Sequence, residues 1–269
     1  MEIVGYIAAI FIGITLGLIG SGGSILTVPV LVYLFKVDAV VATSYSLFIV
    51  GLTSAVGSFS YLKRKMLNAK VIAMFGIPSI LSVILTRNFI LPAIPAHIAS
   101  IGSFEVTKDV LLLLLFGILM IGAAYGMIKN KKRHAIPLTA ETKLNLSLLI
   151  GHGFFIGFIT GLIGAGGGFL IIPALVMLLK IPMKDAVGNS LVIIAANSFI
   201  GFFNSHNHDD INWQLLFSIA ALSIVGIFIG IRLSKNVDGA KLKPGFGWFI
   251  LLMGCYIIIK ETLLRSLLS

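Results

Sequence analysis

The sequence predicts an all-α polytopic membrane protein made of two repeats that are inverted relative to each other. Three observations lead to this fold class: an apolar composition, a regular series of hydrophobic segments, and a duplication of one half in the other. Of the 269 residues, 58% are hydrophobic and only 11% are charged, and the mean hydropathy is +1.08. Soluble domains carry about 25% charged residues, so this chain lacks the polar side chains that a water-facing surface needs.

Hydrophobic segments of membrane length define the predicted elements. A membrane helix needs about 20 mainly apolar residues. Each half contains five apolar segments, of which the second is too short to span a bilayer easily, so we expect eight to ten helices. The first segment has Glu2 where a signal peptide would carry a basic residue, so we expect it to be retained. The segments are 3–20, 24–35, 40–62, 70–87 and 109–128, then 145–164, 168–180, 185–204, 211–232 and 246–264.

The second half of the chain repeats the first. Residues 17–61 align with 161–205 without a gap, and 19 of the 45 positions are identical. The identities include several glycines, a proline (Pro29 and Pro173) and a lysine, all in register, and a shared apolar composition does not produce these. The predicted organisation is a first membrane repeat at 1–128, a basic cytoplasmic linker at 129–144 and a second membrane repeat at 145–269.

Loop charges predict that the two repeats point in opposite directions. The loop after the third segment reads "KRKMLNAK" (63–70) in the first repeat, whereas its counterpart "NSHNHDD" (204–210) holds two acids and no Lys or Arg. Positively charged loops stay in the cytoplasm, so the equivalent loops are expected on opposite faces of the membrane, with both termini outside. The net charge of +10 is concentrated in such loops, which argues against a nucleic-acid partner.

A glycine-rich motif precedes the short segment of each repeat, "GLIGSGG" at 17–23 and "GLIGAGG" at 161–167. A helix break there would expose the first N–H groups of the next helix, which favour an anion, and glycine lets the anion approach the backbone. The alternative is that the glycines only allow helices to cross closely. The residues predicted to hold the anion are Gly20, Ser21, Gly22, Gly23, Ser24, Gly164, Ala165, Gly166, Gly167 and Gly168.

Polar residues form a stripe on the third segment of each repeat. Ser46 and Thr53 are seven residues apart, which keeps them on one helical face, and their counterparts are Ser190 and Asn197, with Asn189 adjacent. Polar side chains in lipid tend to face a bundle interior or a cavity. The two stripes are therefore expected to line a polar path to the glycine motifs. Hydrogen bonds between packed helices are the alternative.

These motifs resemble one family. Both copies of "GLIG[SA]GG[SG]xLxxPxLVxLxK", with "ATSYSLFI" and "AVGNSLVII" downstream, are similar to the sulfite exporter TauE/SafE family, also described as the 4-toluenesulfonate uptake permease family. The resemblance covers nearly the whole chain. It implies a secondary transporter of the plasma membrane that moves small sulfur-containing anions such as sulfite or sulfonates.

The expected function is secondary transport of small anions by alternating access, with the anion at the paired glycine-rich breaks. A passive anion channel, or a transporter of a non-sulfur small organic anion, is the alternative. An intramembrane enzyme would need a nucleophile with its base, paired acids or an H-E-x-x-H motif, and the sequence has none of these. The expected partners are a small anion and the lipid bilayer, and a homo-oligomer is left open.

The remaining candidates are two histidine-containing features. His152 lies inside the first segment of the second repeat, where a histidine is either a proton-coupling group or a packing residue. The loop "HNHDD" at 206–210 holds metal-type ligands without a defined geometry, so no metal site and no cofactor is predicted.

Overall fold

The computed structural model describes residues 2–20, 23–63, 67–101, 104–129, 146–164, 166–179, 183–205, 211–234 and 239–264. Each predicted hydrophobic segment coincides with a helix in this part of the chain. The helices before the linker are α1 (Glu2–Ile19), α2 (Ser24–Tyr33), α3 (Ala39–Lys63), α4 (Ala69–Leu85), α5 (Leu91–Ala93) and α6 (Lys108–Lys129). After it come α7 (Leu146–Ile163), α8 (Gly168–Leu179), α9 (Met183–Phe203), α10 (Trp213–Leu233) and α11 (Gly239–Ile259). The linker lies outside the described residues.

The helices have the length and composition of membrane-spanning helices. Among the described residues, five are long and apolar enough to cross a membrane, and shorter apolar helices occur at 3–19, 24–33 and 147–163. Large apolar side chains such as Phe11, Ile77 and Phe155 are more than half exposed. An aqueous surface would not tolerate so many of them, whereas lipid does. The predicted helical, multi-pass membrane class is confirmed, with one short β-hairpin as the exception.

One connection differs from the sequence expectation. The predicted segments 70–87 and 109–128 leave the interval 88–108 as a connecting loop, but helix α4 continues through a π-helical turn, η1 (Thr86–Ile90), into α5. A short antiparallel hairpin follows, made of β1 (His97–Ile101) and β2 (Phe104–Thr107). The predicted segment ends at Arg87, but in the structure this side chain lies in η1 and is buried in the protein, as part of a longer helix.

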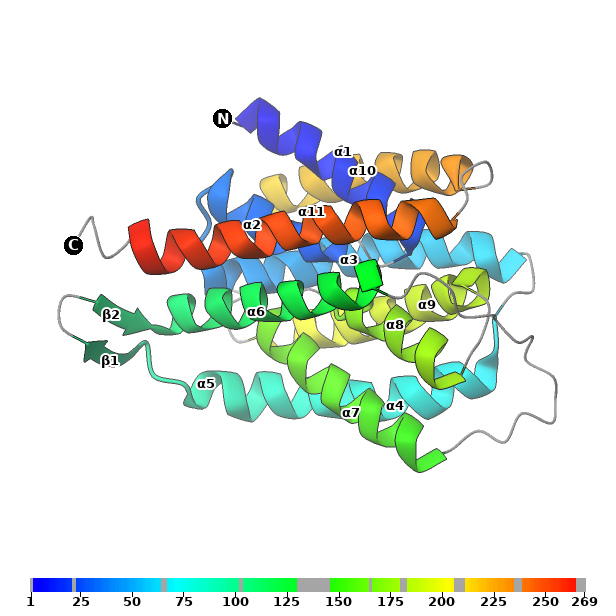
Figure 1. Ribbon diagram of the computed structural model, residues 1–269, viewed down its shortest axis with the longest axis horizontal. Coiled ribbons are helices and arrows are strands. Elements are labelled where there is room, and N and C mark those ends of the chain that lie inside the picture. Colours follow the sequence, from blue (N-terminus) through cyan, green and yellow to red (C-terminus); the bar gives the residue numbers. More distant parts are fainter. Residues whose placement is uncertain are drawn as a thin grey trace.

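The bundle has two distinct ends. Figure 1 shows that α1 begins and α11 ends toward the left of the view, on the side of β1 and β2. The starts of α3 and α6 meet at this end, where Asp109 accepts a hydrogen bond from the backbone N–H of Val40 at 3.0 Å. At the other end, Tyr61 near the end of α3 packs on Gly188 near the start of α9. We call these the hairpin end and the opposite end.

Helix α2 folds back along α1 instead of continuing across the membrane. Gly23, just before α2, lies against the backbone carbonyl of Ile12. Further along, the Phe35 ring lies on Gly5 and meets the Tyr6 ring edge-on, with ring centroids 5.5 Å apart. The chain therefore enters and leaves at the hairpin end. The first short helix forms a re-entrant pair with α1.

Helices α3 and α9 cross in an antiparallel pair at the centre of the bundle, and both are largely buried. Leu47, early in α3, packs on Gly201, late in α9, whereas Gly57, late in α3, packs on Leu191, early in α9. Around this pair, α1 packs on α10, α4 packs on α7, and α6 packs on α11.

The packing repeats itself when the two halves are exchanged. Gly13 of α1 lies against the carbonyl of Ser223 in α10, and Gly157 of α7 lies against the carbonyl of Ser79 in α4. Gly13 and Gly157 are 144 positions apart, and so are Ser79 and Ser223. The sequence duplication has the same offset. The pairs Gly57–Leu191 and Gly201–Leu47 are related in the same way. The duplicated sequence thus makes duplicated contacts.

Candidate functional site

The backbone of both glycine motifs leaves the right-handed helical region. Gly20 has φ +82°, Gly164 has +73°, and Gly166 and Gly167 have +66°. Residues with a Cβ rarely adopt these values, so glycine is what permits the reversal at the ends of α1 and α7. Ser21, Gly22 and Ala165 lie outside the described residues.

Each glycine loop packs on the third helix of the other half. Gly20 lies against the side chain of Val187 in α9, and Gly164 lies against Thr43 in α3. Gly166 lies deeper, between Val50 of α3 and Ser198 of α9, so it reaches the crossing of the two central helices. The second loop is therefore placed between the two halves of the molecule.

The other predicted loop residues complete tight turns. Gly23 is buried against Ile12, and Gly167 is buried against the Thr160 side chain, so neither position has room for a Cβ. Ser24 and Gly168 are the first residues of α2 and α8, and both are buried. The two short helices thus begin inside the protein. Close packing, which was the alternative interpretation, is one real role of these glycines.

Four polar atoms near the crossing are buried and have no hydrogen-bond partner among the described residues. They belong to side chains with 0% exposure. An unpaired buried polar group costs about 1–3 kcal/mol, and native proteins contain few of them. These atoms are therefore candidates for contact with a ligand. They are Ser46 Oγ and Ser54 Oγ in α3, and Asn197 Oδ1 and Ser198 Oγ in α9.

The predicted polar stripes are buried, but some of their groups are used in packing. Thr53 donates to the carbonyl of Ile49 at 2.6 Å, and Ser190 donates to that of Val187 at 2.9 Å. Asn197 donates to Ser79 of α4 at 2.6 Å and keeps its amide oxygen unpaired.

Asn189 has a different role from the rest of its stripe. Its side-chain oxygen accepts from the backbone N–H of Asn68 at 2.7 Å, and its amide nitrogen donates to the carbonyl of Asp185 at 2.7 Å. It therefore connects the start of α4 to α9. These two hydrogen bonds give Asn189 a role in helix packing.

His152 lies half-buried on α7. Its Nδ1 is 2.8 Å from the carbonyl oxygen of Leu148, one turn earlier in the same helix. No side chain in the described part of the chain bonds it. Its proposed part in proton coupling stays a prediction.

Sequence reasoning missed Arg87. Its side chain is 1% exposed, Nη1 lies 3.4 Å from Ser44 Oγ and 3.2 Å from Ser205 Oγ, and Nη2 lies 3.2 Å from Thr43 Oγ1. Its Nε is buried and unpaired. The available signal was a lone arginine within an apolar stretch, 69–93, since ionisable residues inside membranes are usually functional.

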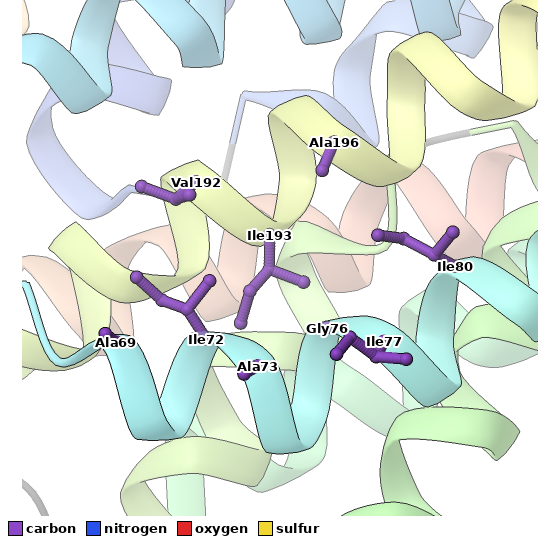
Figure 2. A pocket seen from close by; sticks show the side chains of 9 residues that line it. All are labelled: Ala69, Ile72, Ala73, Gly76, Ile77, Ile80, Val192, Ile193 and Ala196. Carbon is purple, nitrogen blue, oxygen red and sulfur yellow. The ribbon is translucent and has the colours of Figure 1, made fainter.

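A groove of about 300 Å³ lies between α4 and α9 (Figure 2), but its chemistry does not suit an anion. Every residue on its wall is apolar, and none is a predicted site residue. The lining residues are Ala69, Ile72, Ala73, Gly76, Ile77, Ile80, Val192, Ile193 and Ala196.

Comparison with known proteins decides the family. A family model described as sulfite exporter TauE/SafE matches residues 6–257, which is nearly the whole chain. The protein belongs to the TauE/SafE family. This result confirms the resemblance found in the glycine motifs. It also makes the protein a membrane transporter.

Curated relatives of this TauE/SafE member carry matching names. A probable membrane transporter protein of Xylella fastidiosa is 28% identical over 253 residues, covering 92% of this chain and 91% of the relative. YunE of Bacillus subtilis, also named a probable membrane transporter protein, is 24% identical over 273 residues. The match covers 94% of this chain and 97% of YunE. A protein of Methanocaldococcus jannaschii with the same description is 38% identical over 128 residues. This match covers 45% of this chain and 48% of the relative. No solved structure matches the chain. The names indicate a transporter and not an enzyme.

Proposed function

We propose that this protein is a secondary transporter of small anions, in particular sulfur-containing oxyanions or organosulfonates, in the plasma membrane. The anion binds where the glycine loops reach the crossing of α3 and α9. The observation that carries this proposal is the set of buried, unpaired polar atoms at that crossing, of which Ser198 Oγ faces Gly166.

The chemistry of the crossing favours an anion over a cation. Serine hydroxyls can donate hydrogen bonds to anionic oxygens, and α2 and α8 both begin at the loops, so their positive ends are directed toward the same region. The described part of the crossing offers no carboxylate that would attract a cation; Ser46, Ser54 and Ser198 are neutral. Glycine at 166 allows an anionic oxygen to reach backbone N–H groups.

Alternating access follows from two inverted repeats. The duplicated contacts and the antiparallel crossing of α3 with its counterpart α9 support a two-fold axis in the plane of the membrane. Transporters with inverted repeats bind substrate at the repeat interface and move one part against the other. Here α1 packs on α10, and α4 packs on α7. These two helix pairs are the parts that would rock about α3 and α9.

The orientation follows from charge. Helices α3 and α6 end at the opposite end of the bundle, and in the sequence the basic run that begins at Lys63 and the basic linker follow these two ends, so this end faces the cytoplasm. The hairpin end, with the start of α1 and the end of α11, faces outward. Both termini are then outside.

Reconstitution into proteoliposomes tests the function. We expect labelled sulfite, or a small sulfonate such as taurine, to accumulate above its equilibrium level when a proton or sodium gradient is imposed. Flux that only equilibrates the anion would identify a channel instead. Accumulation of a short carboxylate, with no flux of sulfite or sulfonate, would replace the proposed substrate class.

A further inference from the structure

We propose that Arg87 and the hydroxyls around it form a second anion site, between the hairpin end and the central crossing. Its ligand is a small oxyanion with at least two oxygen atoms. This proposal rests on the proposed function in one respect, since it adds a station to the same transport path.

The charge of Arg87 lacks a compensating partner in the described chain. Arginine stays protonated in proteins, and a buried charge without a counter-charge is strongly unfavourable. The partners of its guanidinium are the neutral hydroxyls of Thr43, Ser44 and Ser205. Among the described residues, no carboxylate lies within ion-pair distance of it.

The charged groups beside Arg87, Lys108 and Asp109, do not compensate its charge. The ammonium of Lys108 interacts with Arg87 by charge repulsion. Asp109 lies beside Lys108, but its carboxylate accepts the backbone N–H of Val40 and does not bond Arg87. The two cations and one carboxylate leave an excess of one positive charge, which an anion would neutralise.

The cluster also has hydrogen-bond donors free for a ligand. The Thr43 hydroxyl donates to the carbonyl of Val40 at 2.7 Å, and the Ser205 hydroxyl donates to the carbonyl of Gly201 at 2.9 Å. Both hydroxyls therefore act as acceptors toward Arg87. The Ser44 hydroxyl donates to no described group, and Arg87 Nε–H is unpaired. A guanidinium edge binds two oxygens of one oxyanion in parallel, which a halide cannot match.

The cluster adjoins the central site. Thr43 accepts a hydrogen bond from Arg87 and also lies against Gly164 of the second glycine loop. One turn further along α3 is Ser46, whose Oγ is buried and unpaired. An anion leaving Arg87 would therefore meet the next polar group within one helical turn, on the way to Ser198.

The second half has no equivalent cluster. The residues 144 positions from Arg87, Thr43 and Ser205 are Ile231, Val187 and Tyr61, which are apolar or aromatic and buried. The packing is duplicated, but the cation is not. Within the described residues, the path thus has its charged station near the hairpin end and no counterpart of it at the opposite end.

Binding measurements on the purified full-length protein in detergent test this site. Sulfate and sulfite are the probes, chloride is the comparison ion, and affinity is measured by isothermal titration calorimetry. We expect Arg87→Gln to remove a binding event or weaken it at least about tenfold, the equivalent of one lost hydrogen bond to a charged group. Arg87→Lys should bind weakly because an ammonium cannot bind two oxygens in parallel. Arg232→Gln, which removes an exposed arginine at the end of α10, should bind normally.

Two further variants keep the test decisive. Ser44→Ala removes a free donor without removing the charge, so it should weaken sulfate binding even if Arg87→Gln does not fold. Wild-type affinity in both Ser44→Ala and Arg87→Lys would overturn the proposal. Sulfate binding that appears only in the double variant Asp209→Asn, Asp210→Asn would also overturn it. That result would mean that a loop carboxylate neutralises Arg87 in the unmodified protein. If binding depends on Arg87 but proteoliposomes transport no anion, this site stands and the proposed function fails.

Discussion

Gly166 lies so close to Ser198 that a Cβ on the glycine would be 2.8 Å from the serine hydroxyl oxygen. The contact brings the second glycine loop, at the start of α8, onto the central helix α9 of the same half. Val50 of α3, from the first half, lies 2.7 Å from the same Cβ position. Because Ser198 Oγ has no partner in the described chain, the contact leaves an unpaired hydroxyl beside the buried backbone of Gly166.

Gly166→Ala should abolish or severely reduce transport. A Cβ would meet Val50 and Ser198, and the left-handed φ of +66° costs an L-residue about 1–2 kcal/mol. The measurement is the initial rate of sulfite uptake per reconstituted molecule. Gly151→Ala is the matched control, since no heavy atom lies within 4 Å of its Cβ position on α7. Equal rates in the two variants would contradict a role for this loop.

Ser198→Ala should stabilise the protein and impair its function. Removing an unpaired buried hydroxyl relieves up to about 1–3 kcal/mol, so the unfolding temperature in detergent should rise. The KM for the transported anion should increase about tenfold or more. Ser58→Ala is the control, because the Ser58 hydroxyl donates to the Ala55 carbonyl at 2.7 Å. A lower unfolding temperature with an unchanged KM would assign Ser198 to packing alone.

Asn197→Ala should affect both packing and binding. It removes the 2.6 Å hydrogen bond to Ser79, which joins α9 to α4, and the unpaired amide oxygen at the crossing. We expect a stability loss of about 1–3 kcal/mol and a tenfold to hundredfold loss of anion affinity, as for one hydrogen bond to a charged ligand. Thr53→Val is its counterpart in the first half. If both variants bind and transport the anion normally, the polar stripes serve only helix packing.

Single cysteines test the inverted orientation. In a Cys255→Ser background, Lys65→Cys should be labelled from the cytoplasmic side and Asn207→Cys from outside. Both positions lie outside the described residues, in the loops that follow α3 and α9. An impermeant thiol reagent applied to intact cells and to inverted vesicles makes the comparison. Labelling of both cysteines from one face would exclude the inversion.

The sequence by itself determined the membrane class and the positions of the helices. In lipid, a backbone polar group must be satisfied within its own helix, so each long apolar segment has one stable structure. The sequence also showed the duplication, because glycines, a proline and a lysine recur 144 positions apart. Contacts such as Gly13–Ser223 and Gly157–Ser79 repeat at that same offset.

Only the tertiary structure decided which polar residues are available to a ligand. Ser198 and Asn189 are both buried polar residues of α9, yet the first is unpaired and the second is used to hold α4. The predicted fourth segment stopped at residue 87 and so left the position of the Arg87 side chain open, and the reversal of α2 along α1 was undetermined. These outcomes depend on which helix faces meet across distant parts of the chain. Hydrophobic periodicity describes one helix at a time, whereas a hydrogen bond or a buried charge is defined by its partner on another helix.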